Sequence, residues 1–388
     1  MNKIRKELIA EMIEFRRWMH QNPELSEEEK KTSNHICEVL KKHKIEYRAN
    51  IGGYGIEAIV RGKRPGKTVA AKADMDALPI QEKSELAYKS AVDGVMHACG
   101  HDANTAILLG TAIHLKEKEE ELQGNVKFFF EPAEETIGGG ELMVKEGCMD
   151  NPKVDNIIGL HVMPYLNVGQ IEIKKGCLNA STNEVEITIR GKGGHAAEPS
   201  ECVDPIVVMA YMITALQTFV SRNTAPTDSA VLTFGIAKAG SKGNIIPDTA
   251  YIRGTLRTLL PEQRENAKRR VKEIAQHTAE AFGASAEVNI IDSYDAVIND
   301  NEITDLIIDS SKRLFGEESV VMKEEPSMGA EDFSYFTMKA KGAYFHIGCK
   351  NPEEEEICNL HTERFHLDED CIAYGIMIQS EVLLKLLD

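Results

Sequence analysis

The sequence lacks the features of several protein classes. Its eight cysteines form neither a C-x-x-C pair nor a short disulfide framework, so they do not indicate a disulfide-rich secreted domain. No stretch approaches the ~18 consecutive apolar residues that a bilayer-spanning helix needs, and the N-terminal segment has no uninterrupted apolar core of a signal peptide. We therefore expect a cytoplasmic protein with reduced cysteines and no membrane partner.

Basic residues are too few to balance the acidic ones. The chain has 45 Lys and Arg against 62 Asp and Glu, which gives a formal net charge of −17. Because such a surface repels nucleic acids and anionic membranes, we expect a small-molecule substrate and no nucleic-acid partner. The 388 residues, of which 42% are hydrophobic, are enough for two folded domains.

Short apolar runs that end in polar side chains predict an α/β fold. Residues 67–76, 125–130 and 155–160 read as strands, and the helical spacing of apolar residues over 105–115 separates the first two. The polar residues at or after these strands are Asp74, Asp76, Glu134, Glu135 and His161. Open α/β sheets bind ligands at the carboxyl ends of their strands, so we expect these side chains to converge.

A different pattern occupies the middle of the chain. From about residue 178 to 296 the elements follow the order β-α-β-β-α-β, which is typical of a ferredoxin-like sandwich. After residue 297 helices and strands alternate again. We therefore expect a discontinuous α/β catalytic domain, residues 1–177 and 297–388, with a central, mostly parallel sheet. An α+β domain, residues 178–296, is inserted in it.

The segment 96–102 places a thiol, two imidazoles and a carboxylate close together. Its C-x-H spacing allows Cys99 and His101 to hold one ion. Together with the residues at the strand ends and His361, this mixed ligand set favours a transition metal over Mg²⁺ or Ca²⁺. The residues alone also allow a cysteine hydrolase, in which Cys99 is the nucleophile with His97 or His101 as its base.

Six motifs occur in order along the chain. They are residues 15–25, 73–79, 97–102, 131–135, 193–199 and 329–333. Together they resemble the motifs of the M20 metallopeptidase family. The similarity covers essentially the whole chain and is greatest to the amidohydrolase branch of hippurate hydrolases, N-acyl-amino-acid deacylases and auxin-conjugate hydrolases.

This resemblance implies a metal centre with one or two divalent ions, of Zn, Mn, Co or Ni, and a ligand shared between the ions at Cys99. The implied ligands are Cys99, His101, Glu135, His161 and His361.

The resemblance also assigns residues outside the ligand set. It makes Glu134 the general base and gives Asp76 the task of orienting a ligand. It implies that the inserted domain is a lid that forms a homodimer, with His195 reaching a neighbouring site to stabilise the oxyanion. Asn244 and Arg257 resemble positions that hold the substrate carboxylate, a task for which the fork of Arg is suited.

From these residues we expect a metal-dependent amidohydrolase. It would cleave the amide bond of N-acetyl, benzoyl or similar N-acyl amino acids and release a carboxylic acid and a free amino acid. A dipeptidase or aminoacylase of broader specificity is the first alternative. The second is a metal-containing binding protein of the same fold without catalysis, which would not need Glu134.

Overall fold

The computed structural model describes residues 4–350 and 357–388 and has two compact units. The larger unit comprises Met1–Leu178, Ile298–Glu325 and Asp332–Asp388, and the smaller one Asn179–Val297 and Pro326–Glu331. The chain passes from one to the other in β7, Gly176–Asn179, and in β14, Val297–Asn299, and again at both ends of Pro326–Glu331.

The larger unit is built on an eight-stranded sheet with the order β1-β2-β4-β3-β5-β16-β6-β15. Its strands are β1 Glu46–Ile51, β2 Gly55–Arg61, β3 Arg64–Asp74, β4 Gln123–Glu131, β5 Asn156–Asn167, β6 Ile171–Ile173, β15 Val320–Met322 and β16 Lys341–Lys350. The four central strands β4, β3, β5 and β16 are parallel, whereas β2 and β6 pair antiparallel with their inner neighbours. The predicted α/β class with a mostly parallel central sheet is confirmed.

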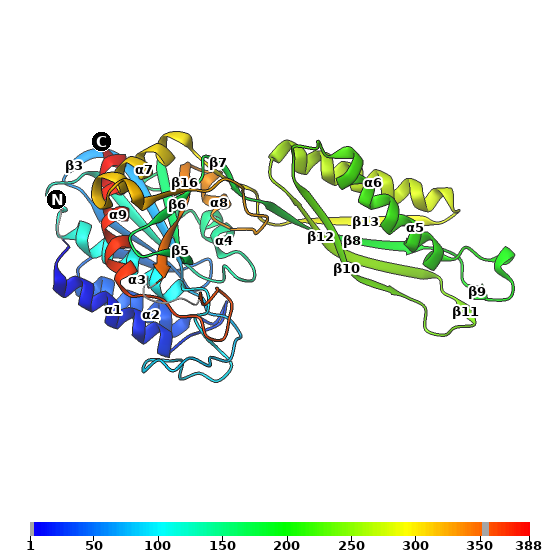
Figure 1. The fold of residues 1–388 in the computed structure, drawn as a ribbon, viewed down its shortest axis with the longest axis horizontal. Coiled ribbons are helices and arrows are strands. Elements are labelled where there is room, and N and C mark those ends of the chain that lie inside the picture. The colour runs from blue at the N-terminus through cyan, green and yellow to red at the C-terminus, as the bar shows by residue number, and fades with distance from the viewer. Residues whose placement is uncertain (1–3, 351–356) are drawn as a thin grey trace. The chain divides into compact units, whose positions relative to one another are not determined.

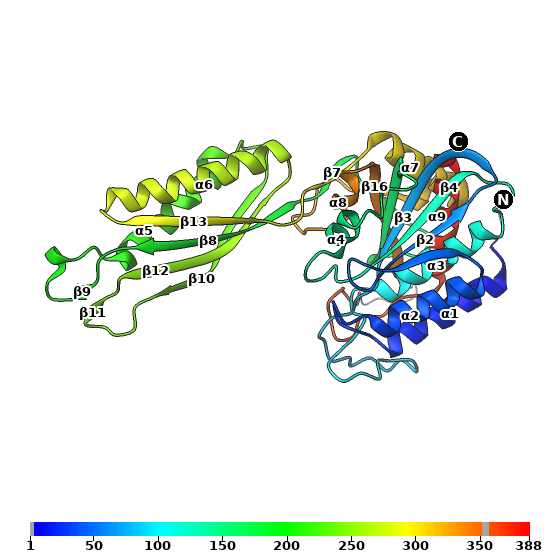
Figure 2. The ribbon, with the colours of Figure 1, turned by 180° about the vertical axis from the view of Figure 1, so that it is seen from behind.

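Helices cover both faces of this sheet (Figure 1, Figure 2). They are α1 Lys6–Gln21, α2 Lys30–Lys42, α3 His101–Lys116, α4 Gly139–Lys145, α7 Asn301–Phe315, α8 Ser334–Thr337 and α9 Asp370–Leu387. On one face α3 packs against α1 and α9, and on the other α4 packs against α8. Because both faces are covered, central strands can be apolar throughout, and Phe128, Phe129 and Phe130 of β4 are all fully buried.

Strand β5 is longer than the sequence predicts. Its apolar run suggested an end at Leu160, but the strand continues to Asn167 and contains His161. The reason is its neighbour: β16 pairs with β5 through His346 opposite His161 and on to Gly348 opposite Met163. His161 therefore projects from the body of a strand and not from the loop after it.

The smaller unit has the predicted β-α-β-β-α-β order. Its elements are β8 Ser181–Arg190, α5 Pro205–Thr218, β10 Ala230–Ala239, β12 Thr249–Thr258, α6 Pro261–Ala281 and β13 Ser285–Asp292, with the short pair β9 Gly194–His195 and β11 Ile245–Ile246. The antiparallel sheet has the order β10-β12-β8-β13. Alternate residues Val185, Ile187 and Ile189 of β8 are fully buried in the core shared with α5 and α6.

The segment Pro326–Glu331 belongs to the smaller unit, although its sequence position predicted the larger one. Hydrogen bonds explain the difference. The Ala180 backbone N–H donates to the carbonyls of Ser327 and Gly329, at 3.0 and 3.1 Å. These contacts join residues far apart in the sequence, so local patterns do not reveal them.

In the described part of the chain, one helical stretch, Pro205–Asn223, meets the length and composition of a membrane-crossing helix. It spans α5 and the π-helical turn after it. Val208, Met212, Leu216 and Phe219 point into the core of the smaller unit. A helix with one face in a protein core meets the same length and composition, so this feature does not identify a membrane protein.

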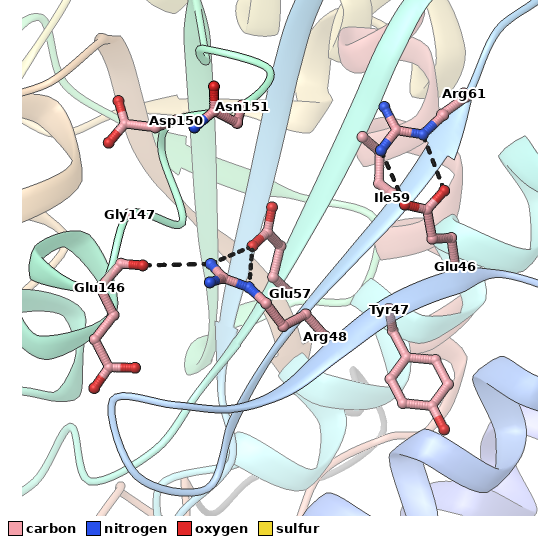
Figure 3. Close-up of a pocket in the computed structure, with 10 residues that line it drawn as sticks. All are labelled: Glu46, Tyr47, Arg48, Glu57, Ile59, Arg61, Glu146, Gly147, Asp150 and Asn151. Atoms are coloured by element: carbon pink, nitrogen blue, oxygen red, sulfur yellow. Dashed lines mark hydrogen bonds and ion pairs between the residues drawn. The ribbon is translucent and has the colours of Figure 1, made fainter.

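A surface pocket of about 370 Å³ lies at the β1–β2 edge of the large sheet (Figure 3). Its two arginines are both paired: Arg48 donates to Glu57 at 2.8 Å and Arg61 donates to Glu46 at 2.9 Å. Charged pairs of this kind protect an edge strand against pairing with another chain. None of the predicted site residues lines this pocket.

The buried imidazole of His114 makes folding stability depend on pH. Burial in α3 lowers the pKa of His114 from its ordinary value of 6.5 to about 4. The unfolded chain therefore binds a proton at a higher pH than the folded chain does, and stability falls as the pH drops from about 6.5 towards 4. We expect His114→Leu to lose less unfolding free energy between pH 7 and pH 5 than the wild type, as measured by urea unfolding in a chelator.

The exposed His277 provides the control, since its side chain is 77% accessible. His277→Leu should keep the wild-type dependence on pH. Equal slopes for the wild type and His114→Leu would contradict a neutral, buried His114.

Candidate metal centre

Cys99 and His101 lie on either side of Gly100, where the loop after β3 enters α3. Gly100 has a φ of +81°, and a Cβ at this position would lie 2.4 Å from Val162 Cγ2. A side chain does not fit there. The glycine turn therefore brings two potential ligands, both buried, to the start of α3 beside β5.

Hydrogen bonds orient two of the imidazoles through their Nδ1 atoms. His101 Nδ1 lies 3.0 Å from the Asp76 carbonyl oxygen and 3.1 Å from its Oδ1. His161 Nδ1 donates to the Val162 carbonyl at 2.7 Å, and its Nε2 lies 3.4 Å from Cys99 Sγ. Metal-binding histidines commonly have one nitrogen anchored in this way, which leaves Nε2 for the ion.

His361 and Glu135 complete the group from two further segments. His361 Nε2 lies 3.3 Å from Cys99 Sγ and 3.2 Å from Glu135 Oε1. The His361 backbone N–H donates to the Ala98 carbonyl at 2.8 Å and so holds the loop from the C-terminal part of the chain against the Cys99 loop.

The structure brings the predicted ligand residues together in overlapping groups. Cys99, His101 and His161 form one group, and Cys99, Glu135 and His361 form another; within each, the potential ligand atoms lie within 4.8 Å of one another. Cys99 belongs to both groups. Two ions that share one thiolate would need this arrangement.

Two of the potential ligands have raised pKa values. Burial raises the pKa of the Cys99 thiol to about 12. Burial opposes a charge on His101, but Cys99 and Asp76 together raise its pKa well above the usual value. Metal ligands must lose these protons, so an ion would compete with them. The donor set of sulfur, imidazole nitrogen and carboxylate oxygen fits a transition metal.

Glu134 lies in the turn that follows β4. Its carboxylate forms a third group with His101 and Glu135, again with atoms within 4.8 Å. The next residue is held in place through its backbone, since the Glu135 N–H donates to Asp76 Oδ2 at 3.1 Å. Asp76 thus contacts both the His101 imidazole and the segment that carries the two glutamates.

Other polar residues of the predicted motifs lie in neighbouring networks. Asp74 forms an ion pair with the buried Lys72 at 2.5 Å and groups with Glu131 and Asp332. Asp102 accepts from His20 Nδ1 at 2.8 Å. His97 is buried, and among the described residues neither ring nitrogen has a hydrogen-bond partner.

Two residues that the sequence motifs did not indicate support the site from the segment before α2. Ser26 Oγ donates to Asp76 Oδ2 at 2.7 Å, and the Ala133 N–H donates to Glu29 Oε1 at 2.7 Å. Both follow the motif that ends at Leu25. Their position just before α2 is the one sequence signal that marks them, and it does not indicate what they contact.

The three site residues predicted in the smaller unit do not lie together. His195 in β9 pairs with Ile245 in β11, so Asn244 lies close to His195. Arg257 is near the opposite end of the sheet, where its Nη1 donates to the Met328 carbonyl at 2.9 Å. The segments that carry β9 and β11 adjoin Arg190 and Thr249, and Arg257 lies eight residue steps along β12 from Thr249. At ~3.3 Å per residue this is roughly 26 Å.

Comparison with known proteins identifies the family. Residues 70–385 match the model of peptidase family M20/M25/M40. The chain belongs to this family. The resemblance predicted from the motifs is confirmed, and with it the expectation of a metal-dependent hydrolase.

The similarity to known relatives extends over nearly the whole chain. It is 37% identical to thermostable carboxypeptidase 2 of Saccharolobus solfataricus over 98% of this chain and 96% of that one. It is 38% identical to N-acetyl-L-cysteine deacetylase of Bacillus subtilis, over 98% of this chain and 89% of that one. A solved Bacillus subtilis structure, described as a dinuclear metal binding peptidase from the M20 family, has a TM-score of 0.85 and 33% identity over 99% of both chains.

The contacts of Cys99 predict the effect of its replacement. Cys99→Ser should lower the bound metal to well below the wild-type amount, because a thiolate common to both ligand groups is lost. Metal content by plasma mass spectrometry after dialysis measures this. Cys37→Ser, at a partly buried cysteine of α2, should leave the metal content unchanged. Wild-type metal content in Cys99→Ser would contradict the ligand assignment.

Proposed function

We propose that this protein hydrolyses the amide bond of N-acyl amino acids, releasing a carboxylic acid and a free amino acid. The observation that carries the proposal is the overlap of three groups of potential ligands: Cys99, His101 and His161; Cys99, Glu135 and His361; and His101, Glu134 and Glu135. The relative named N-acetyl-L-cysteine deacetylase supports an acyl group such as acetyl.

Cys99, His101, Glu135, His161 and His361 would hold one or two divalent ions, of Zn, Mn, Co or Ni. When bound, the ion supplies Lewis acidity that polarises the scissile carbonyl and acidifies the attacking water. The two anchored imidazoles, His101 and His161, stay in the orientation that the ion requires because their Nδ1 atoms are already bonded.

Glu134 is the proposed general base. Its carboxylate accepts a proton from the attacking water and delivers it to the leaving amine nitrogen. Asp76 acts one step removed, since its carboxylate orients His101 and fixes the backbone of Glu135. Glu134 thus contacts the substrate directly, whereas Asp76 positions other groups of the site.

The substrate carboxylate and the oxyanion require groups from the smaller unit. We assign the carboxylate to Asn244 and Arg257 and the oxyanion to His195, an electrostatic role typically worth ~3 kcal/mol per donor. Asn244 and Arg257 lie at opposite ends of one small sheet, so one chain cannot bring both to the same carboxylate. We therefore propose a homodimer in which each site takes Arg257 from one chain and His195 and Asn244 from its partner.

The surface of α5 supports association of two smaller units. Three large apolar side chains of this helix, Ile206, Val207 and Tyr211, are 40%, 45% and 58% exposed. Neighbouring apolar side chains on a surface commonly mark an interface between proteins.

A carboxypeptidase activity is the second candidate, favoured by the 37% identity to thermostable carboxypeptidase 2. The chemistry is shared, because both reactions cleave an amide bond whose amine side carries a free carboxylate. They differ in what lies on the acyl side: a simple acyl group in one case and a peptide in the other.

An assay of released amine, with the metal-loaded protein and a panel of substrates, tests the function. The panel combines acetyl, benzoyl and indole-acyl amino acids with short peptides and with amides whose carboxylate is blocked. We expect turnover of the N-acyl amino acids and none of the blocked amides. Faster cleavage of peptides would favour the carboxypeptidase, and no turnover of any member would contradict both.

Glu134→Gln is the matched variant for this assay. It should keep the metal content and lose activity by ~10²- to 10⁴-fold, since proton transfer by a positioned base contributes about that much. A chelator should also abolish activity, whereas an enzyme with a Cys99 nucleophile would survive it.

The exchange of residues between protomers has its own test. A heterodimer of one Glu134→Gln chain and one His195→Ala chain, isolated by two affinity tags, contains one site with both groups intact. It should have about half of the wild-type activity, since one of the two sites of a symmetric dimer remains. Both homodimers should be nearly inactive, and an inactive heterodimer would contradict the action of His195 across the interface.

A further inference from the structure

The turn that carries Glu134 begins in an unfavourable backbone conformation. Ala133, directly before Glu134, has a φ of +54° and is buried. This left-handed region costs an L-residue free energy because its Cβ crowds the following carbonyl oxygen. Such a conformation persists where the surrounding contacts hold it.

Hydrogen bonds of its carbonyl group and its N–H hold Ala133 in this conformation. Its carbonyl oxygen accepts from the Gly138 N–H at 3.1 Å, which closes the turn around the two glutamates. Its N–H donates to Glu29 Oε1 at 2.7 Å. Glu29 is fully buried at the start of α2, so its carboxyl group reaches the turn from a segment over a hundred positions earlier in the sequence.

Glu134 is therefore held on both sides by carboxyl groups. The N–H of the residue before it is bonded to Glu29, and the N–H of the residue after it is bonded to Asp76 Oδ2. Asp76 also orients the candidate ligand His101, whereas the carboxyl group of Glu29 bonds to the backbone of Ala133.

We infer that Glu29 is a positioning residue: its carboxyl group holds Ala133 in the left-handed conformation and thereby fixes where the Glu134 carboxylate lies. This rests on the proposed role of Glu134. Glu29 acts through the backbone of the turn, so its loss should lower kcat and leave substrate binding largely unchanged.

The state of the Glu29 carboxyl group agrees with a hydrogen-bonding task. Burial, together with the nearby charge of Asp76, raises its pKa to about 7. A protonated and an ionised carboxyl group both offer an oxygen that accepts from the Ala133 N–H. The task therefore requires an acceptor at the right distance, and a charge is not needed.

Three variants separate the hydrogen-bond acceptor, the length and the charge of the Glu29 side chain. Glu29→Gln keeps the acceptor and the length of the side chain, Glu29→Asp keeps the carboxylate but is one methylene too short, and Glu29→Ala loses both. Glu28→Ala is the matched control, because Glu28 is an exposed glutamate next to Glu29. Metal content and thermal unfolding are measured for each, so that losses of metal or of folded protein are recognised.

Steady-state kinetics give the first readout. We expect kcat to fall ~10- to 100-fold in Glu29→Ala and Glu29→Asp, since a small misplacement of a catalytic group has effects of this size. KM and metal content should stay within about twofold, and Glu29→Gln should keep kcat within about threefold of the wild type. Glu28→Ala should match the wild type.

Hydrogen exchange by mass spectrometry gives a second readout that needs no activity. The peptide over residues 131–138 should exchange faster in Glu29→Ala and Glu29→Asp and at the wild-type rate in Glu29→Gln. If the wild type hydrolyses no member of the panel, the proposed function is wrong. The exchange rates still show whether Glu29 holds the turn of residues 131–138.

Three outcomes would overturn the inference. One is unchanged kcat and unchanged exchange in Glu29→Ala. Another is a Glu29→Gln variant as impaired as Glu29→Ala, which would show that the charge matters. The third is a loss of thermal stability alone, with normal kcat for the folded fraction, because Glu29 would then have only a structural role.

Discussion

The buried carboxylate of Asp76 connects the parts of the site. It lies just beyond β3 and contacts His101 at the start of α3, the backbone of Glu135 after β4, and Ser26 before α2. Burial opposes its charge, but its hydrogen bonds, above all that with His101, lower the pKa of Asp76. A charged group at this place therefore joins three segments of the chain and orients the candidate ligand His101.

Paired charges hold the sheet and its covering helices beneath the site. Lys72 is fully buried and lies 2.5 Å from Asp74, 3.3 Å from Glu131 and 3.4 Å from Asp332. Burial and the charge of Asp332 raise the pKa of Glu131 well above its usual value. Removing one partner of such a buried group is costly, because the remaining charge is left uncompensated.

The smaller unit shows how topology limits function. The pairing of Thr249 with Arg190 and of Arg257 with Thr182 puts the β9–β11 pair beyond one end of the sheet and Arg257 at the other end. Residues that could bind the same carboxylate are thereby separated within one chain. If these residues act as proposed, a second copy of the chain is part of the site, and association and catalysis are coupled.

The sequence by itself determined the elements and indicated the candidate ligands. Period-two and period-3.6 patterns identify strands and helices because side-chain direction is a local property, and the motifs pointed to Cys99, His101, Glu134 and Glu135. Only the tertiary structure decided which distant residues meet. Glu29 bonds to Ala133, His361 lies on Cys99, β5 extends past His161 through its pairing with β16, and residues 326–331 join the smaller unit. These contacts depend on strand order and on the packing of helices over the sheet. Both bring together distant segments, and the local sequence of one segment does not indicate which other segment it contacts.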